Sequence, residues 1–305
     1  SRDNNRIKDS ISFGLAKQVG INLLSGSQFY NGGKGFDLMD RTLELASKHN
    51  MRVLAIDSKL LVNDKMFTSN DADKIITHFK GNNKTLKETF GGYSFGGEFS
   101  LAQSKDVKKW ISYFKRNHPD KLAYTYLFPS YGFKDRIIYE KYLDTYLNDK
   151  NPNARPDVVA FDYYPFLSPS ILTSYFYNLD VIKQKAGNRP FWYYIQSTTK
   201  KNLPDITDYQ MKFMAYCPLA YGAKGALYYT YESIPSNYGL NYHDAIINPY
   251  GNVTKKYYLT KIINYYMSYI AGPIIMSNSC VGTYHVSQEP TNEKIPARQI
   301  LSSTN

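Results

Sequence analysis

Four acidic residues each close a short apolar run of the sequence, and carboxylates in such positions can act as acids, bases or nucleophiles. They are Asp57, Glu98, Asp162 and Glu232. Glycoside hydrolysis uses two carboxyl groups across the scissile bond, one protonated and one ionised. If the apolar runs are strands whose ends meet, these residues predict a hydrolytic carbohydrate site.

Glu98 is the best candidate for the catalytic acid. It follows the glycine-rich run GGYSFGG (91–97), and glycines beside it would leave room for a ligand to approach the backbone. The alternative is a structural role, either in a salt bridge inside the fold or as the cap of a helix expected from residue 104.

Asp162 and Glu232 are the candidates for the second catalytic carboxylate. Asp162 precedes Tyr163, Tyr164 and a proline, where the proline ends the strand and the aromatic rings could stack on a sugar. Its alternative is a buried carboxylate that orients its neighbours. Glu232 closes the last apolar run, which suits a nucleophile or a substrate ligand.

Other residues at the ends of the runs are predicted to bind the substrate. Gln196 can hydrogen-bond a hydroxyl group but cannot act as an acid or a nucleophile. Asp57 is a weaker catalytic candidate, because an aspartate after a strand is often only a loop or helix cap. The predicted substrate-binding residues are Asp57, Tyr163, Tyr164, Trp192, Gln196, Tyr229 and Tyr231.

Seven apolar runs, each followed by a helical pattern, would position these residues. They cover 20–25, 52–57, 91–98, 122–128, 157–164, 190–196 and 225–232. The runs lack polar alternation, which is typical of parallel strands covered on both faces. Their starts lie roughly 30 to 40 residues apart, the size of one βαβ repeat. The repeats predict an α/β fold, a (β/α)8 TIM barrel, whose active site would lie at the carboxyl ends of the strands.

The intervening stretches have the spacing of amphipathic helices. Val107, Trp110, Ile111 and Phe114, for example, form a 3-4-3 stripe. Helices are expected over 7–18, 37–46, 104–114, 139–147, 171–182, 209–220 and 253–270. Because the first helix precedes the first run, we expect either that the first barrel strand lies upstream of Ser1 or that the barrel is open. Residues 58–90 are expected to form a long polar connection at the rim of the site.

The pattern changes after about residue 275. Residues 281–287 alternate as a β-strand does, and a polar tail follows. The sequence therefore predicts a barrel over 1–275 and a C-terminal β extension, or the start of a β-sandwich module, over 276–305.

The composition restricts the classes of protein. Of the 305 residues 43% are hydrophobic and 21% charged, which excludes global disorder. The 30 tyrosines suit sugar rings, because tyrosine combines an apolar face with a hydroxyl group, although a compositional bias of the genome would give the same excess. A net charge of +11 can indicate an acidic partner, such as a uronate-containing glycan or another acidic polymer.

Several functions are not expected. Without a dense basic run or a recognition motif, nucleic-acid binding is not predicted, and the pairs Lys200-Lys201 and Lys255-Lys256 are interpreted as solvated faces. The two cysteines and five histidines lack metal-ligand spacing, so neither a metal nor another cofactor is expected. No apolar run approaches the ~18 residues of a transmembrane segment. His243 could act as a base that is oriented by the carboxylate of Asp244. Adjacent side chains on a strand or helix point apart, however, so a role in a loop is favoured.

The order of several motifs resembles that of bacterial β-galactosidase-like barrels of the clan A glycoside hydrolase type. The motifs are GGYSFGGEFS, LAYTYLFPSYG, VVAFDYYPF, PFWYYIQS, LAYGAKGALYYTY and NPYGNVTKKYYLTKIINYY, and they cover roughly residues 10 to 275. The resemblance implies a (β/α)8 fold, an oligo- or polysaccharide substrate, and a secreted, periplasmic or cell-surface location. It also implies a β-sandwich after the barrel.

The resemblance assigns catalytic roles unevenly. In this clan the fourth strand ends in the acid/base glutamate, which Glu98 matches, although Gly97 and Phe99 replace the usual neighbours. The clan's nucleophile, a glutamate, ends the seventh strand, where this sequence has Gln196. Three interpretations follow: Glu232 or Asp162 takes the second role, an inverting route uses a water molecule, or the chain is an inactive glycan-binding or structural barrel of a surface assembly. The first two predict a glycosidase.

Overall fold

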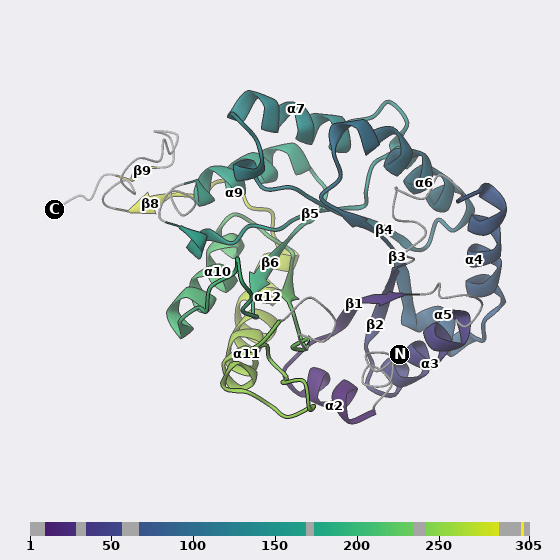
Figure 1. Ribbon diagram of the computed structural model, residues 1–305. Coiled ribbons are helices and arrows are strands. Elements are labelled where there is room, and N and C mark those ends of the chain that lie inside the picture. The colour runs from purple at the N-terminus through teal and green to yellow at the C-terminus, as the bar shows by residue number, and fades with distance from the viewer. Residues whose placement is uncertain are drawn as a thin grey trace. The chain divides into compact units, whose positions relative to one another are not determined.

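The computed structural model describes residues 10–28, 35–56, 67–168, 174–234, 242–286 and 300–301. Its main sheet has seven strands, which follow one another in the order of the chain (Figure 1). They are β1 (Leu23–Gln28), β2 (Arg52–Ile56), β3 (Phe90–Gly97), β4 (Leu122–Leu127), β5 (Val158–Phe161), β6 (Phe191–Gln196) and β7 (Gly225–Tyr229). The recorded pairings of β1 to β4 and of β6 with β7 are parallel. The predicted fold class, a (β/α)8 barrel with one strand missing from the described residues, is confirmed.

Helices separate the strands, as the spacing of apolar residues predicts. They are α2 (Ser10–Gln18), α3 (Gly35–Lys48), α4 (Ser69–Gly81), α5 (Lys84–Thr89), α6 (Ser104–Asn117), α7 (Arg136–Leu147), α9 (Tyr175–Ala186), α10 (Asp208–Ala220), α11 (Lys255–Tyr265) and α12 (Gly272–Ser277). A π-helical stretch, Tyr266–Ala271, joins the last two helices. The chain divides into two compact units: unit 1 comprises 1–127 and 142–159, and unit 2 comprises 128–141 and 160–305.

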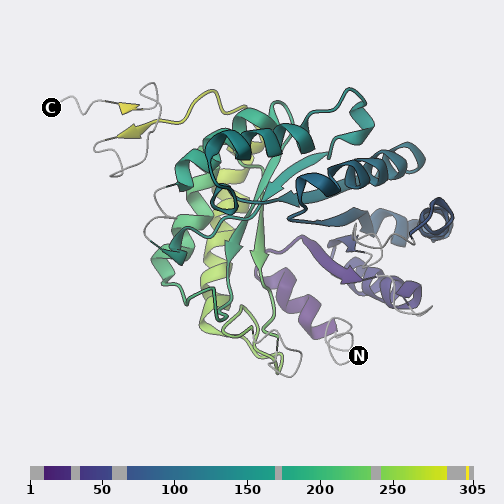
Figure 2. The ribbon, with the colours of Figure 1, turned by 45° about the horizontal axis from the view of Figure 1, so that its top comes forward.

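The core of unit 1 lies between β3 and its covering helices. The ring of Phe79, from α4, stacks on Phe90 with centroids 3.9 Å apart. Phe114, from α6, contacts Tyr93 and Phe95 at 4.3 and 5.4 Å. The predicted stripe of α6 is buried throughout. In unit 2, α9 and α10 pack on β6, and α10 contacts α11 (Figure 2).

The predicted polar connection over 58–90 is helical in its described part, which is a correction to the sequence analysis. Thr68 accepts a hydrogen bond from the N–H of Asp71 and donates its own N–H to that side chain, a capping box that starts α4. The buried residues of α4 are Ala72, Ile75, Ile76 and Phe79. These lie at helical spacing among polar residues, so this segment covers the sheet. Residues 57–66, with the predicted binding residue Asp57, lie outside the described residues.

The C-terminal segment contains less strand than the alternation over 281–287 predicts. Of the described residues 281–286, His285 and Val286 form strand β8, which pairs in parallel with β9 (Ile300–Leu301). The preceding residues attach to the end of α10, where the Thr283 hydroxyl donates to the Ala220 carbonyl over 3.0 Å. The boundary at residue 276 stays a prediction.

Acid should destabilise unit 1 through His118. This residue is buried, and its Nδ1 lies 2.7 Å from the Tyr93 hydroxyl. Burial lowers the pKa of His118, while the carboxylate of Asp120 acts in the opposite direction. Because the folded state binds the proton less tightly than the unfolded chain, the stability contributed by neutral His118 is complete above about pH 6.5 and is lost as the pH falls through the folded pKa.

The test is the urea concentration at the midpoint of unfolding, measured at about pH 7.5 and at about pH 5.5. We expect this midpoint to fall less between the two pH values in His118→Gln than in the wild type. Part of the loss should remain, because burial also lowers the pKa of His285 in unit 2. An unchanged pH dependence in the variant would contradict the assignment.

Candidate functional site

Glu98 directly follows β3, as predicted, and has an unusual backbone conformation. Its φ of 56° lies in the left-handed region, and its N–H donates to the Tyr126 carbonyl over 3.0 Å. Non-glycine residues rarely adopt this region, and those that do cluster in turns and functional sites. The Glu98 side chain is exposed and forms no hydrogen bond or ion pair with other described residues. The turn before α6 is capped by Ser100 and Gln103 instead.

A β-bulge immediately before Glu98 disturbs the strand. Ser94 pairs with Tyr124 and Gly97 with Tyr126, so that one extra residue of β3 lies between these pairs. The extra residue breaks the alternation of side chains, and the direction of Glu98 cannot be counted from the sequence.

The glycines of β3 make room for β4. A Cβ added to Gly92 would lie 2.3 Å from the carbonyl oxygen of Leu122, and one added to Gly97 would lie 2.4 Å from the ring of Tyr126. The space that the sequence analysis assigned to a ligand is therefore occupied, at these two positions, by Leu122 and Tyr126.

In unit 2, Asp162, Tyr163 and Tyr164 follow β5. Tyr163 is buried, with its ring 5.0 Å from that of Tyr131. Tyr164 is also buried. Burial raises the pKa of the Tyr164 phenol well above its usual value, and the negative charge of Asp162 raises it further. Tyr164 therefore stays neutral and keeps a hydroxyl that can donate beside a carboxylate.

Gln196 ends β6, and its side chain is completely buried. Its Nε2 donates to the backbone carbonyl of Thr198 over 3.2 Å and to that of Pro204. Since both partners are acceptors, the amide nitrogen must face them. The Oε1 is buried and accepts no hydrogen bond from any described residue. The end of β6 thus carries a buried, uncharged acceptor.

Tyr229 ends β7 and belongs to a tyrosine–lysine cluster, which we define as Tyr164, Lys200, Tyr229 and Tyr242. The ring of Tyr229 lies 6.0 Å from that of Tyr164 and 5.8 Å from that of Tyr242. The phenol oxygens of Tyr229 and Tyr242 are 2.8 Å apart. The Nζ of Lys200 lies 5.5 Å from the Tyr229 ring centroid and 5.0 Å from that of Tyr242.

Backbone hydrogen bonds hold this cluster together. The N–H of Ser197 donates to the Tyr229 carbonyl over 2.9 Å. Thr199 and His243 exchange two backbone hydrogen bonds, of 2.8 and 3.0 Å. These bonds bring Tyr242, which is remote from any apolar run, beside the ends of β6 and β7.

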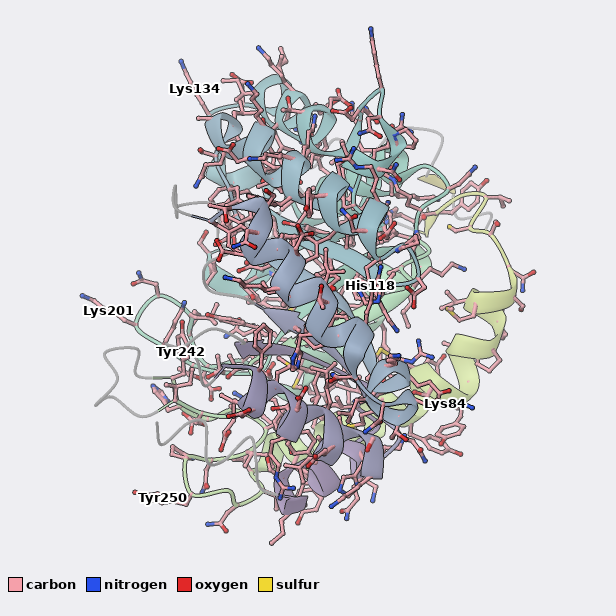
Figure 3. All side chains as sticks on the ribbon, turned by 90° about the vertical axis from the view of Figure 1, so that its right-hand side faces the viewer. Lys84, His118, Lys134, Lys201, Tyr242 and Tyr250 are labelled. Atoms are coloured by element: carbon pink, nitrogen blue, oxygen red, sulfur yellow. The ribbon has the colours of Figure 1, made fainter. Side chains whose placement is uncertain are left out.

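Lys200 and Tyr242 are site residues that the sequence analysis missed. The interpretation of Lys200-Lys201 as a solvated pair is wrong for Lys200, which is half-buried against two rings, and right for the exposed Lys201. Figure 3 shows Lys201 and Tyr242 on the same side of unit 2, with Lys201 pointing away from the ribbon.

The remaining predicted residues lie in different places. Tyr231 and Glu232 follow β7 and are half-buried, and the N–H of Ile247 donates to the Tyr231 carbonyl over 2.9 Å. Trp192 lies near the opposite end of β6 from Gln196. A Cβ added to Gly225, at the start of β7, would be 2.6 Å from Cδ1 of its indole. The structure therefore brings together Tyr164, Gln196 and Tyr229 but does not bring Trp192 to them.

His243 and Asp244 do pair, contrary to the expectation for adjacent side chains. The His243 Nδ1 lies 2.5 Å from a carboxylate oxygen of Asp244. The reason is the φ of 54° at Asp244, a left-handed conformation in which the usual divergence of neighbouring side chains does not apply. Both side chains are exposed.

Neither a metal centre nor a membrane-spanning helix is found within the described ranges. No group of three or more His, Cys, Asp or Glu residues there is placed to hold a metal ion. No helix among those residues has both the length and the apolar character that a bilayer crossing needs.

No protein-family model and no curated protein matches the sequence. Solved structures do match the fold. The β-galactosidase of the psychrophilic Marinomonas ef1 has a TM-score of 0.64 and 10% identity, over 91% of this chain and 60% of that chain. The β-galactosidase of the Antarctic haloarchaeon Halorubrum lacusprofundi has a TM-score of 0.61 and 12% identity, over 91% and 57%. The endo-β-1,4-mannanase of Thermotoga petrophila has a TM-score of 0.55 and 13% identity, over 87% and 74%.

This chain thus spans less than two thirds of the length of either β-galactosidase. At these identities the likeness concerns the fold. The chain has the (β/α)8 fold of the clan A glycoside hydrolases, as the motifs predicted.

The glycine interpretation predicts a contrast within β3. Gly92→Ala should lower the free energy of unfolding by about 3 kcal/mol, because its Cβ would meet the backbone of Leu122. Gly91→Ala is the matched control. Its Cβ would be no closer than 3.4 Å to any neighbour, and it should stay within about 1 kcal/mol of the wild type. Equal effects in urea unfolding would refute the role given to Gly92.

The contacts of Gln196 predict that Gln196→Glu is less stable than the wild type at about pH 7.5, by about 3 kcal/mol. A carboxylate oxygen would face two carbonyl oxygens, which raises the pKa of the new carboxyl group above that of an unfolded glutamate. The stability of the variant is therefore retained below the unfolded pKa and lost as the pH rises through the raised folded pKa.

Urea midpoints at about pH 7.5 and about pH 4.5, each compared with the wild type, measure this difference. Gln103→Glu is the control, because the amide oxygen of Gln103 accepts from the N–H and hydroxyl of Ser100 at 2.8 and 2.9 Å, and a carboxylate oxygen can accept the same two hydrogen bonds. A Gln196→Glu protein as stable as Gln103→Glu at both pH values would disprove the assigned orientation of the amide.

Proposed function

We propose that this chain is the barrel of a glycoside hydrolase and that it binds a glycan at the carboxyl ends of β5, β6 and β7. The observation that carries the proposal is the arrangement in unit 2 of Asp162 and Tyr164, which follow β5, with Gln196 and Tyr229, which end β6 and β7. It combines a carboxylate, neutral phenols with apolar faces, and an uncharged buried acceptor. Sugar recognition uses these groups, and the fold has its active sites at this end of the strands.

The resemblance to clan A assigns the general acid to Glu98 and leaves the second carboxyl role to either Glu232 or Asp162. The acid donates its proton to the glycosidic oxygen as the bond to the leaving sugar breaks. The second carboxylate either attacks the anomeric carbon or takes a proton from the water that does so. Gln196, as an amide, supplies no nucleophile. The same resemblance supports a secreted, periplasmic or cell-surface location, where polysaccharides are met.

Glycan binding without cleavage is the second candidate function. It is favoured by Gln196, whose amide replaces the clan's nucleophile and is held by two backbone carbonyls. It is also favoured by the exposed Glu98 side chain, because no described partner surrounds it to hold a proton.

Two substitutions test the hydrolase proposal with mannan oligosaccharides and aryl β-galactosides as probes, chosen from the activities in the names of the structural neighbours. Glu98→Gln and Asp162→Asn should each lower kcat/KM at least ~100-fold while changing the Kd of the same oligosaccharide little. Reducing-end release measures the first quantity and calorimetry the second.

Glu88→Gln and Asp208→Asn, whose native side chains are 67% and 44% exposed, are matched controls and should keep wild-type rates. Binding by the wild type without release of any product would favour the second candidate. Failure to bind any oligosaccharide would reject both.

A further inference from the structure

Lys200 is fixed at the end of β6 by its own backbone. Its N–H donates to the Leu203 carbonyl and its carbonyl accepts from the Leu203 N–H, both over 2.9 Å. This tight turn holds the Cα beside the strand end. The side chain then extends to Tyr242, whose hydroxyl lies 3.4 Å from Nζ.

The charge of Lys200 is not neutralised by the described residues, which include no salt-bridge partner for it. Two acidic residues close to Lys200 in the chain or across the Thr199–His243 pair, Asp205 and Asp244, form ion pairs with other residues. Asp205 pairs with Lys256 at 3.0 Å, and Asp244 pairs with His243.

Three other half-buried lysines differ from Lys200 in this respect, whereas Lys183 and Lys224 donate to Cys280 Sγ and to backbone carbonyl groups. Lys108, Lys115 and Lys256 have side chains 18%, 18% and 13% exposed, and each contacts an aspartate. Such pairing is the usual way to compensate a charge withdrawn from water. Lys200 has two aromatic rings in place of a carboxylate.

We infer that the glycan bound in unit 2 carries an anionic sugar and that Lys200 binds its acidic group, either a carboxylate or a sulfate ester. This inference rests on the proposed glycan site. One N–H of the ammonium group is directed at the Tyr242 hydroxyl, and two remain for an anionic oxygen. A neutral sugar placed there would exclude water from the ammonium group without replacing the lost solvation, whereas an anionic group replaces it.

The rings of the cluster suit the rest of such a ligand. The ring centroids of Tyr164 and Tyr229 lie 6.0 Å apart. The two side chains together offer apolar ring surface and hydroxyl groups to a sugar. The net charge of +11 would also attract an acidic polymer at long range.

The test is calorimetric binding of three probes to the full chain: an oligogalacturonate, a sulfated galactan oligosaccharide and a neutral mannan oligosaccharide. The wild type should bind at least one of the two anionic probes more tightly than the neutral one. The preferred probe identifies the acidic group as carboxylate or sulfate.

Lys200→Met should weaken binding of the preferred anionic probe about 10- to 100-fold, the usual effect of losing a charge-assisted hydrogen bond. The adjacent Lys201→Met removes the same charge from an exposed side chain and should change the Kd less than about twofold. Lys200→Arg, which keeps the charge, should restore much of the affinity and so exclude a loss through misfolding.

Three results would overturn the inference. One is equal binding of neutral and anionic probes, which leaves the proposed glycan site intact. Another is an equal loss in Lys200→Met and Lys201→Met, which would mean general electrostatic attraction. The third, no binding of any probe, would remove the proposed function as well.

Discussion

Parallel pairing of strands is the constraint on which the candidate site depends. When every strand runs in the same direction, each one ends at the same edge of the sheet, and a helix must return the chain to the other edge. In unit 2 the register places Gln196 opposite Tyr229 at the ends of β6 and β7. The N–H of Ser197 then bonds to Tyr229, so the two strand ends stay together whatever their side chains are. The chemistry of such an edge can change while the fold is retained, as the fold shared at 10% to 13% identity illustrates.

Local burial patterns explain how much could be predicted. The continuous apolar runs predicted all seven strands to within a few residues, because a strand covered on both faces must be apolar along its length. The positions of Glu98, Asp162 and Gln196 at strand ends follow directly from those runs. The stripe of α6 was predictable for the same reason, whereas α4 was missed because its few apolar residues lie in a polar background.

Features that depend on partners distant in sequence could not be predicted. The bulge before Glu98 exists only relative to β4, and the glycines that looked like space for a ligand accommodate Leu122 and Tyr126. The contact of Lys200 with Tyr242 depends on the backbone exchange between Thr199 and His243. The pairing of His243 with Asp244 depends on one left-handed residue. In each case a backbone conformation or register sets which side chains meet.

The two charged groups near the tyrosines, Asp162 and Lys200, explain why such a site would prefer an anionic sugar to a neutral one. Asp162 acts on the phenol of Tyr164, whereas Lys200 lies over Tyr229 and Tyr242, and it forms no salt bridge within the described ranges. If the two charges met, each would neutralise the other and neither would be available to a ligand. The buried ring of Tyr164 beside Tyr229 provides neutral surface between them, and Gln196 adds an acceptor without a charge.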